Sequence, residues 1–198
     1  MPRPSGHGDV RTLSGNTQRC TPPGAALSFV WTCAPGGWLL TADWNAREEA
    51  QGKVSPAWSG AGLAAAKRQR QPAAVPVPFD PADFFRDPRC WRPPVDLPPG
   101  SAHARRVWQA LCAIPVGQTR SYGQIAREIG SSAQAVGQAC KANPWPLFVP
   151  CHRVVPAAGF DPASAGGYSG QRDGPLARVK AWLLVHEARV EAGSVRGG

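Results

Sequence analysis

The sequence has no uninterrupted apolar run near 18 residues, and its opening stretch, residues 1–9, has no apolar segment of the secretory type. Membrane-spanning helices and secretory signals both need such segments, so we expect neither. The six cysteines form no CxxC pair and no regular framework, and 198 residues can bury a core without disulfides. Reduced thiols are typical of the cell interior, and we therefore expect a soluble cytoplasmic protein.

Acidic residues are also scarce. The chain has 13 Asp and Glu against 22 Lys and Arg, which gives a formal net charge of +9 and a pI near 9.9. This balance favours a polyanionic partner such as nucleic acid, or simply a basic surface that keeps the protein dissolved. Composition alone leaves both alternatives open.

Large apolar side chains are almost absent from residues 1–24, so this stretch lacks the means to bury itself and is predicted to be a flexible tail. Residues 191–198 are predicted to be a second flexible tail. Between the tails we expect two domains, over residues 25–99 and over residues 100–190. The run Pro98-Pro99-Gly100 is the predicted linker, because consecutive prolines are stiff and end a preceding element.

The N-terminal domain has one clear signal. Residues 27–33 alternate apolar and smaller side chains, residues 34–37 are Ala-Pro-Gly-Gly, and residues 38–42 are again mostly apolar. Two such runs about a turn predict a β-hairpin. Beyond Asn45 the pattern weakens, with a short helix expected at residues 63–70 and then many prolines.

Helical signals are stronger past residue 100. Apolar residues at helical spacing predict a helix over residues 102–113. Ser121 and Gln124 read as a capping box, and Gly130 as the C-terminal end of the short helix that the box starts. A second helix should begin near Ser132, and two short helices joined by a glycine-containing turn indicate a helix-turn-helix.

The second of these helices has two different faces. Gln134, Gln138 and Lys141 share the outward face, while the inward face is predicted to carry Ala133, Val136, Gly137 and Cys140. Small side chains at Ala133, Ala135, Gly137 and Ala139 allow close approach to another surface. A DNA contact and a purely structural helix pair both fit this pattern.

The last helical stretch places a carboxylate on an apolar stripe. Glu187 shares one face with Leu176, Val179, Lys180 and Leu183. An unpaired buried charge is costly, so a specific partner for Glu187 is expected; the alternative is a helix-end carboxylate that reaches solvent. Lys180 has the same two alternatives, a role in a site or a side chain that extends to solvent.

Cys151 and His152 are neighbours in the densest part of the chain. A thiolate is a strong nucleophile, and a nearby imidazole favours its formation. Pro150 restricts the backbone, so we expect Cys151 on a strand-like support. Neighbours in a strand point in opposite directions, so His152 would act through a water or a turn. The alternative is an inert, buried structural cysteine.

Separated motifs decide between these alternatives. Pro150-Cys151-His152-Arg153-Val154-Val155, with Asn143-Pro144 eight residues earlier and Gly167-Tyr168-Ser169-Gly170 later, closely resembles the active-site signature of the O6-alkylguanine-DNA alkyltransferases. The resemblance covers roughly residues 101–189. It implies an α/β protein, with a small N-terminal domain of ribonuclease-H-like topology and a mainly helical, winged-helix-like catalytic domain that contains the helix-turn-helix.

The resemblance also implies an activity: single-turnover repair, in which the alkyl group of O6-alkylguanine moves to Cys151 and stays there. The partner would be double-stranded DNA, bound by a monomer through the minor groove with the damaged nucleotide flipped out. By the same resemblance the catalytic residues are Cys151, His152, Glu187, Asn143, Tyr122 and Lys180. The substrate-binding residues would be Tyr168, Ser169, Val149 and Gly166, and the DNA-binding residues Gln134, Ala135, Gly137, Gln138, Lys141 and Arg153.

The chain departs from the family pattern in three places. Gln134 stands where the family usually has an arginine that fills the space left by the flipped base, which predicts weaker DNA binding or flipping. The loop over residues 160–165 is longer than usual, and His103-Ala104 replaces a common Phe-Gln pair. Some relatives hold a structural zinc, but Cys20, Cys33, Cys90 and His7 lack ligand spacing, so we predict no metal and no other cofactor.

Two rival functions remain. A damage sensor would bind alkylated DNA with weak or no transfer, although sensors of this kind replace the reactive cysteine that is present here. A thiol hydrolase built on Cys, His and Glu would turn over repeatedly on a small substrate without DNA. A gain in protein mass would indicate repair, DNA binding without a gain in mass would indicate a sensor, and repeated turnover without DNA would indicate a hydrolase.

Overall fold

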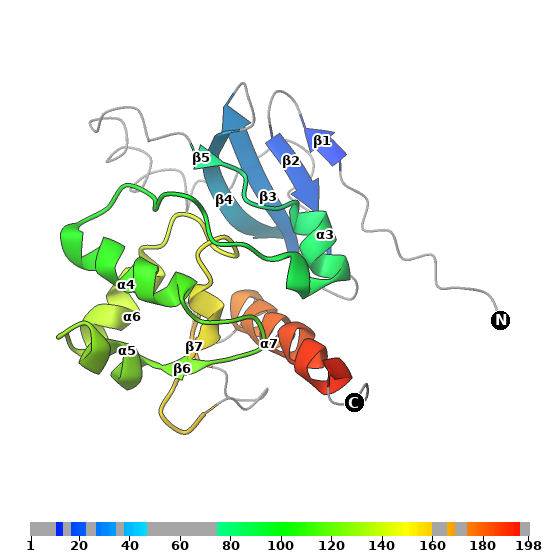
Figure 1. Ribbon diagram of the computed structural model, residues 1–198. Coiled ribbons are helices and arrows are strands. Elements are labelled where there is room, and N and C mark those ends of the chain that lie inside the picture. The colour runs from blue at the N-terminus through cyan, green and yellow to red at the C-terminus, as the bar shows by residue number, and fades with distance from the viewer. Residues whose placement is uncertain are drawn as a thin grey trace.

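The computed structural model describes residues 11–13, 17–22, 27–34, 38–46, 75–159, 166–168 and 174–194. The protein is a mixed α/β structure in which an antiparallel sheet lies beside a group of helices (Figure 1). The helix expected at residues 63–70 and the loop over residues 160–165 lie outside the described residues. No described helix is long and apolar enough to cross a membrane.

The sheet has five strands in the order of the sequence. They are β1 (Arg11–Leu13), β2 (Thr17–Cys20), β3 (Leu27–Ala34), β4 (Trp38–Ala46) and β5 (Val75–Pro76), and each pairs antiparallel with the next. The predicted hairpin is confirmed as β3 and β4, with an irregularity in register between Thr32 and Cys33.

The expectation of a structureless tail over residues 1–24 was wrong for β1 and β2. Thr17 to Cys20 pair with β3 along their whole length, and the Cys20 side chain is fully buried. Backbone hydrogen bonds to an existing strand do not require large side chains, because the partner strand supplies the apolar surface. A count of apolar residues therefore missed these strands.

Aromatic rings join the sheet to the rest of the molecule. Phe29 of β3 is the centre of this cluster, with its ring centroid 5.0 Å from that of Trp44 in β4 and 6.3 Å from Phe85. Phe85 belongs to α3 (Pro81–Arg86), which begins at the side-chain cap of Asp80. Phe148, three residues before Cys151, lies 5.9 Å from Phe29. The sheet thus supports the chain segment that carries the candidate nucleophile.

The three helices that follow match the sequence prediction. They are α4 (Ala102–Cys112), α5 (Tyr122–Glu128) and α6 (Ala133–Lys141). The capping box is confirmed: the Ser121 hydroxyl accepts from the Gln124 N–H, and the Gln124 side chain accepts from the Ser121 N–H. Gly130 has a φ of +62°, which suits the residue after a helix end.

Short elements complete the structure. They are the 3₁₀ turns η2 (Pro88–Cys90) and η3 (Cys151–Arg153), the two-stranded parallel pair of β6 (Arg120–Ser121) and β7 (Val154–Val155), and α7 (Pro175–Ser194). Helix α7 contacts β3, η2 and η3, and lies below the sheet in Figure 1. It therefore touches both the sheet and the turn that starts with Cys151.

Candidate active site

Cys151 opens a tight turn rather than lying in a strand, so the predicted strand-like support was wrong. Cys151 to Arg153 form η3, and the Cys151 N–H donates to Val149 O at 2.8 Å. The φ that proline imposes on Pro150 is compatible with helical as well as extended backbone, and here Pro150 precedes a 3₁₀ turn. The Cys151 side chain is buried, 4% exposed.

Asn143 ties this turn to the segment before it. Its side-chain N–H group donates to Val149 O at 2.9 Å and to Cys151 Sγ at 3.2 Å, while Asn143 Oδ1 accepts from the Trp145 N–H. The three contacts fix the amide orientation, so that a donor points at the sulfur. A donor at this position favours the thiolate over the thiol.

Burial raises the pKa of the Cys151 thiol above its ordinary value, because it disfavours the charged form. The Asn143 amide and the Lys180 ammonium oppose this rise. The hydroxyl of buried Tyr168 opposes it as well, although no hydrogen bond of ordinary length joins Tyr168 to the sulfur. The resting cysteine is therefore a thiol that needs a proton acceptor before it can react.

His152 has the hydrogen bonding that such an acceptor needs. Its Nε2 lies 2.9 Å from Glu187 Oε1, and both side chains are buried. A nitrogen that faces a carboxylate carries the hydrogen, so in the neutral ring the lone pair is on Nδ1. Burial lowers the pKa of His152, which keeps the ring neutral, and Nδ1 makes no hydrogen bond within the described residues. This nitrogen is free to accept a proton.

Glu187 has the partners that its position on an apolar stripe predicted. Besides His152, it accepts a bidentate pair of hydrogen bonds from Arg153, and its Oε2 lies 3.3 Å from the Gly117 N–H. Burial alone would raise the pKa of Glu187, but His152 and Arg153 outweigh it and lower the pKa to about 2. Glu187 is a carboxylate at neutral pH, and the alternative of a solvent-exposed helix end is excluded.

Arg153 does not reach the surface, so its assignment as a DNA-binding residue was wrong. Its side chain is fully buried and donates to Glu187 and, through Nη1, to Ile114 O at 2.6 Å. A guanidinium that is fully buried cannot reach a phosphate at the protein surface. No local pattern distinguished this outcome, because an arginine beside His152 fits an exposed contact equally well.

Tyr122 and Lys180 form a second pair, and the Lys180 ammonium acts electrostatically on Cys151. Lys180 is fully buried, which excludes a side chain extended to solvent, and its Nζ donates to Val154 O at 2.7 Å and to Gly167 O at 3.3 Å. The Tyr122 hydroxyl lies 3.5 Å from the same Nζ. Burial lowers the pKa of Lys180 to about 8 and raises the pKa of Tyr122. The tyrosine is therefore a neutral hydroxyl beside a cation.

The predicted substrate-binding residues gather near this pair only in part. Val149 is buried and joined to Asn143, and Gly166 has a φ of +78° close to Lys180 Nζ. Tyr168 is buried, 3% exposed. Ser169 lies outside the described residues.

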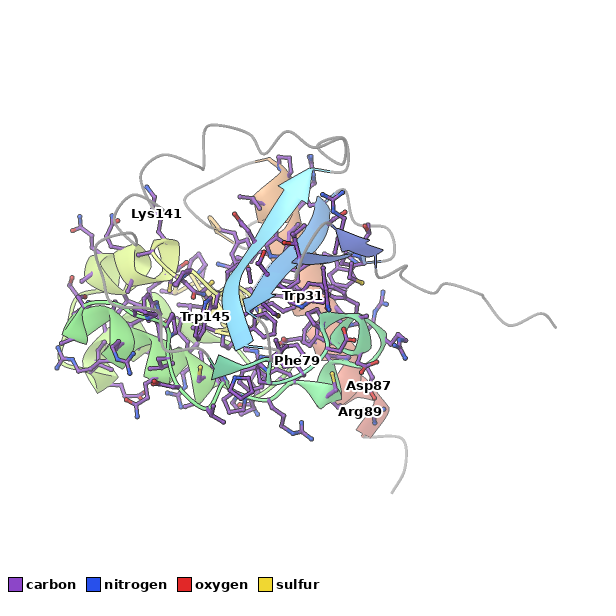
Figure 2. All side chains as sticks on the ribbon, turned by 90° about the horizontal axis from the view of Figure 1, so that it is seen from above. Trp31, Phe79, Asp87, Arg89, Lys141 and Trp145 are labelled. Carbon is purple, nitrogen blue, oxygen red and sulfur yellow. The ribbon has the colours of Figure 1, made fainter. Side chains whose placement is uncertain are left out.

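The predicted DNA-binding residues of α6 lie on the outside of the helix group. Gln134, Gln138 and Lys141 are exposed, and Ala135 and Gly137 are half-buried. Figure 2 shows Lys141 at the far end of the molecule from Asp87 and Arg89. The buried face consists of Val136, Ala139 and Cys140. Ala133, predicted to face inward, is exposed at the first residue of α6, so that prediction was wrong.

Two contacts orient α6. The Trp108 indole N–H of α4 donates to Ala139 O at 2.9 Å, and His103 Nε2 lies 2.8 Å from Ser131 Oγ in the turn before α6. The departure at His103-Ala104 thus supplies a polar contact to the helix-turn-helix, while Ala104 is buried. Sequence reasoning did not find this role for His103.

The candidate metal ligands are not assembled in the described part of the chain. Cys20, Cys33 and Cys90 are free thiols, and no three His, Cys, Asp or Glu side chains of the described residues come together as a possible metal site. His7 lies outside the described residues.

Comparisons with known proteins agree with this geometry. Residues 102–189 match the family described as 6-O-methylguanine DNA methyltransferase, DNA binding domain. The chain is 51% identical over 92 residues to the methylated-DNA--protein-cysteine methyltransferase of Mycolicibacterium paratuberculosis, covering 46% of this chain and 50% of that protein. It is 46% identical over 100 residues to the regulatory protein Ada of Salmonella typhimurium, covering 50% of this chain and 26% of that protein.

Solved structures extend the likeness to the N-terminal half. The Mycobacterium tuberculosis O6-methylguanine methyltransferase is 28% identical with a TM-score of 0.51, covering 86% of this chain and 91% of that one. The Mycobacterium tuberculosis OGT in complex with DNA is 28% identical with a TM-score of 0.51, covering 82% and 87%. The chain spans half or less of the curated relatives named above. These matches, together with the arrangement around Cys151, show that residues 102–189 belong to the family described as 6-O-methylguanine DNA methyltransferase, DNA binding domain.

Proposed function

We propose that this protein repairs DNA by moving the alkyl group of O6-alkylguanine to Cys151 in a single turnover. The observation that carries the proposal is the 3.2 Å contact between Asn143 Nδ2 and Cys151 Sγ, beside the buried pair of His152 and Glu187. A donor aimed at the sulfur and a neutral imidazole held by a carboxylate are what activation of a thiol nucleophile requires. An inert structural cysteine needs neither.

The reaction is a displacement at the alkyl carbon. The Cys151 proton passes through a water to His152 Nδ1, the thiolate forms the carbon–sulfur bond, and the carbon–oxygen bond breaks with its electron pair going to guanine. The Tyr122 hydroxyl protonates the departing base and regains a proton from solvent, while His152 releases its own. Lys180 stabilises the thiolate. The thioether product is stable, so each molecule acts once.

Recognition of the substrate rests on the helix-turn-helix. In this proposal α6 enters the minor groove of alkylated duplex DNA, with Gln134, Ala135, Gly137, Gln138 and Lys141 at the contact. The modified atom inside a stacked duplex cannot be reached, so the nucleotide flips into a site lined by Val149, Gly166, Tyr168 and Ser169. Arg153 is not among the DNA contacts.

The finer architecture belongs to the same proposal. We assign residues 25–99 to a ribonuclease-H-like domain, extended by β1 and β2, and residues 100–190 to a winged-helix-like catalytic domain. The protein would act as a monomer in the cytoplasm, where its thiols stay reduced. The likeness to the Mycobacterium tuberculosis O6-methylguanine methyltransferase, which covers 86% of the chain, supports a shared mixed α/β architecture.

The test is the mass of the intact protein after incubation with duplex DNA that contains O6-methylguanine. We expect the gain of one methyl group, located on Cys151 by peptide mapping and abolished by Cys151→Ala. The matched control is Cys33→Ala, which removes a half-buried thiol of β3 and should leave transfer intact. Binding of the modified duplex without a gain in mass would indicate a damage sensor, and repeated DNA-independent turnover would indicate a hydrolase.

A further inference from the structure

Trp91 lies outside the matched family region, yet it touches the candidate site. It follows η2, is 7% exposed, and its ring lies against the guanidinium of Arg153, with 4.1 Å between Arg153 Cζ and the ring centroid. The Trp91 indole N–H donates to Leu147 O at 3.1 Å. Leu147 has a φ of +71°, a left-handed conformation that is uncommon for leucine. Trp91 therefore contacts both the turn before Cys151 and the arginine after it.

Arg153 transmits this contact to Glu187. One face of its guanidinium meets the indole, and its edge donates to the carboxylate, with Nε 2.9 Å from Oε2 and Nη2 2.9 Å from Oε1. Glu187 Oε1 also meets His152 Nε2 at 2.9 Å. One oxygen thus joins the arginine to the imidazole, and the order of contacts is Trp91, Arg153, Glu187, His152.

We propose that Trp91 is a positioning residue for alkyl transfer, which holds Arg153 flat against Glu187 and thereby fixes the orientation and charge state of His152. This inference rests on the proposed function, because it assigns His152 the role of proton acceptor. A planar guanidinium can stack on an aromatic face and bind a carboxylate with its edge at once, which neither lysine nor a smaller cation can do. The N-terminal half would in this way take part in the chemistry of the C-terminal half.

The sign of the effect follows from the charges around His152. The ionisable groups that face it are Glu187 and Lys180 of α7 and Arg153 of η3. Glu187 favours the protonated imidazole, and the two cations oppose it. Loosening Arg153 leaves the carboxylate less neutralised, so His152 holds its proton to higher pH. Transfer should then be slow near neutral pH and recover as the pH rises.

The test compares Trp91→Met with Trp91→Phe. Methionine fills space without an aromatic face, while phenylalanine keeps the face and loses only the N–H donor. Trp182→Met is the matched control, because that indole stacks on His186 instead. We measure the rate of methyl transfer to Cys151 against pH, the affinity for the modified duplex, and the titration of His152 by ¹⁵N NMR.

Trp91→Met should transfer the methyl group about fivefold more slowly at neutral pH, an amount typical of a lost cation–π contact. The pH at which its transfer rate falls on the acid side should be higher than in wild type. His152 should titrate at higher pH in the same variant, while DNA affinity, the phenylalanine variant and the control stay close to wild type. A uniform rate loss at all pH values, or a loss of DNA affinity instead, overturns the proposal.

Failure of the proposed function is distinguishable from failure of this inference. If the wild-type protein gains no methyl group, the repair function is wrong, whereas the His152 titration still reports on Trp91. If Trp91→Met does not fold, Arg153→Lys is judged by the same readouts, because lysine keeps the charge and loses the flat, bidentate contact. An unchanged His152 titration in a folded variant refutes the positioning role.

Discussion

Replacing Glu187 by glutamine removes the carboxylate that meets both His152 and Arg153 in the interior. The side chain is 1% exposed and Arg153 is fully buried, so water cannot take the place of the lost charge. The variant keeps the shape of the residue and one acceptor oxygen. The substitution leaves the buried Arg153 guanidinium without a negative partner. The experiment measures the free-energy cost of that unpaired charge.

Breaking a buried ion pair by removing one partner costs about 3–5 kcal/mol, mostly because the remaining charge is stranded. Glutamine still accepts a hydrogen bond, so we expect a loss of about 3 kcal/mol in the free energy of unfolding at pH 7. The double variant Glu187→Gln with Arg153→Met removes the stranded charge as well. Its stability should therefore exceed that of Glu187→Gln alone.

Acid titration gives the same prediction independently. The pKa of Glu187 is lowered from 4.5 to about 2 in the folded protein. A lowered carboxyl pKa stabilises the fold above the unfolded value, and this contribution is lost as the pH falls from 4.5 toward 2. The difference between the unfolded and folded pKa values corresponds to about 3 kcal/mol of stability. This pH-dependent contribution should be absent from Glu187→Gln and from the double variant.

The assay is urea unfolding, followed by far-UV circular dichroism and by tryptophan fluorescence to test for coincident two-state transitions. Wild type, Glu187→Gln, Arg153→Met and the double variant form a thermodynamic cycle at pH 7. Wild type and the two variants that lack Glu187 are also measured from pH 5 downward. If the double variant is destabilised by the sum of the two single losses, the pair is not coupled. The stranded-charge reasoning would then be refuted.

Other predictions concern the recognition helix, the cation near the sulfur and a glycine at positive φ. Gln134→Arg should bind the modified duplex more tightly. Its affinity should also fall more steeply with salt concentration, by the amount expected for about one additional phosphate contact, and fluorescence anisotropy measures both. Lys180→Met should slow transfer to Cys151 about tenfold at pH 7 if the thiol pKa rises by about one unit, with recovery at higher pH. Gly166→Ala should lower the free energy of unfolding by about 1–3 kcal/mol, because its φ is +78° and a Cβ would lie 3.1 Å from a proline ring. Gly159→Ala, at a φ of +90° in open space, separates backbone strain from that steric contact.

Local signals in the sequence predicted α4, α5, α6 and the β3–β4 hairpin, whereas α3 was not predicted. Ser121 and Gln124 are three residues apart, and a capping box needs nothing from the rest of the fold. Glu187 could be assigned a buried partner because helical periodicity alone placed it on the apolar stripe. In each case the deciding interaction lies within a few residues of chain or follows from the helical repeat.

The errors have the opposite character, because they concern contacts between distant segments. Arg153 is buried because Glu187 lies 34 residues later and Ile114 lies 39 residues earlier, and neither separation is visible in a motif. Pro150 fixes φ but leaves ψ free, so it could not distinguish a strand from the 3₁₀ turn at Cys151. Tertiary pairing determined each of these outcomes.

The basic composition has a different meaning once the cations are placed. Arg153 and Lys180 are fully buried beside the candidate nucleophile, where they act on Glu187 and on the Cys151 sulfur rather than on phosphates. Exposed Arg89 pairs with Asp87 at 2.8 Å, so that its charge is locally balanced. Lys141 makes no ion pair with the described residues and lies on α6. Attraction to DNA therefore depends on where each cation lies. The net charge of +9 overstates the positive charge that is exposed to a phosphate backbone.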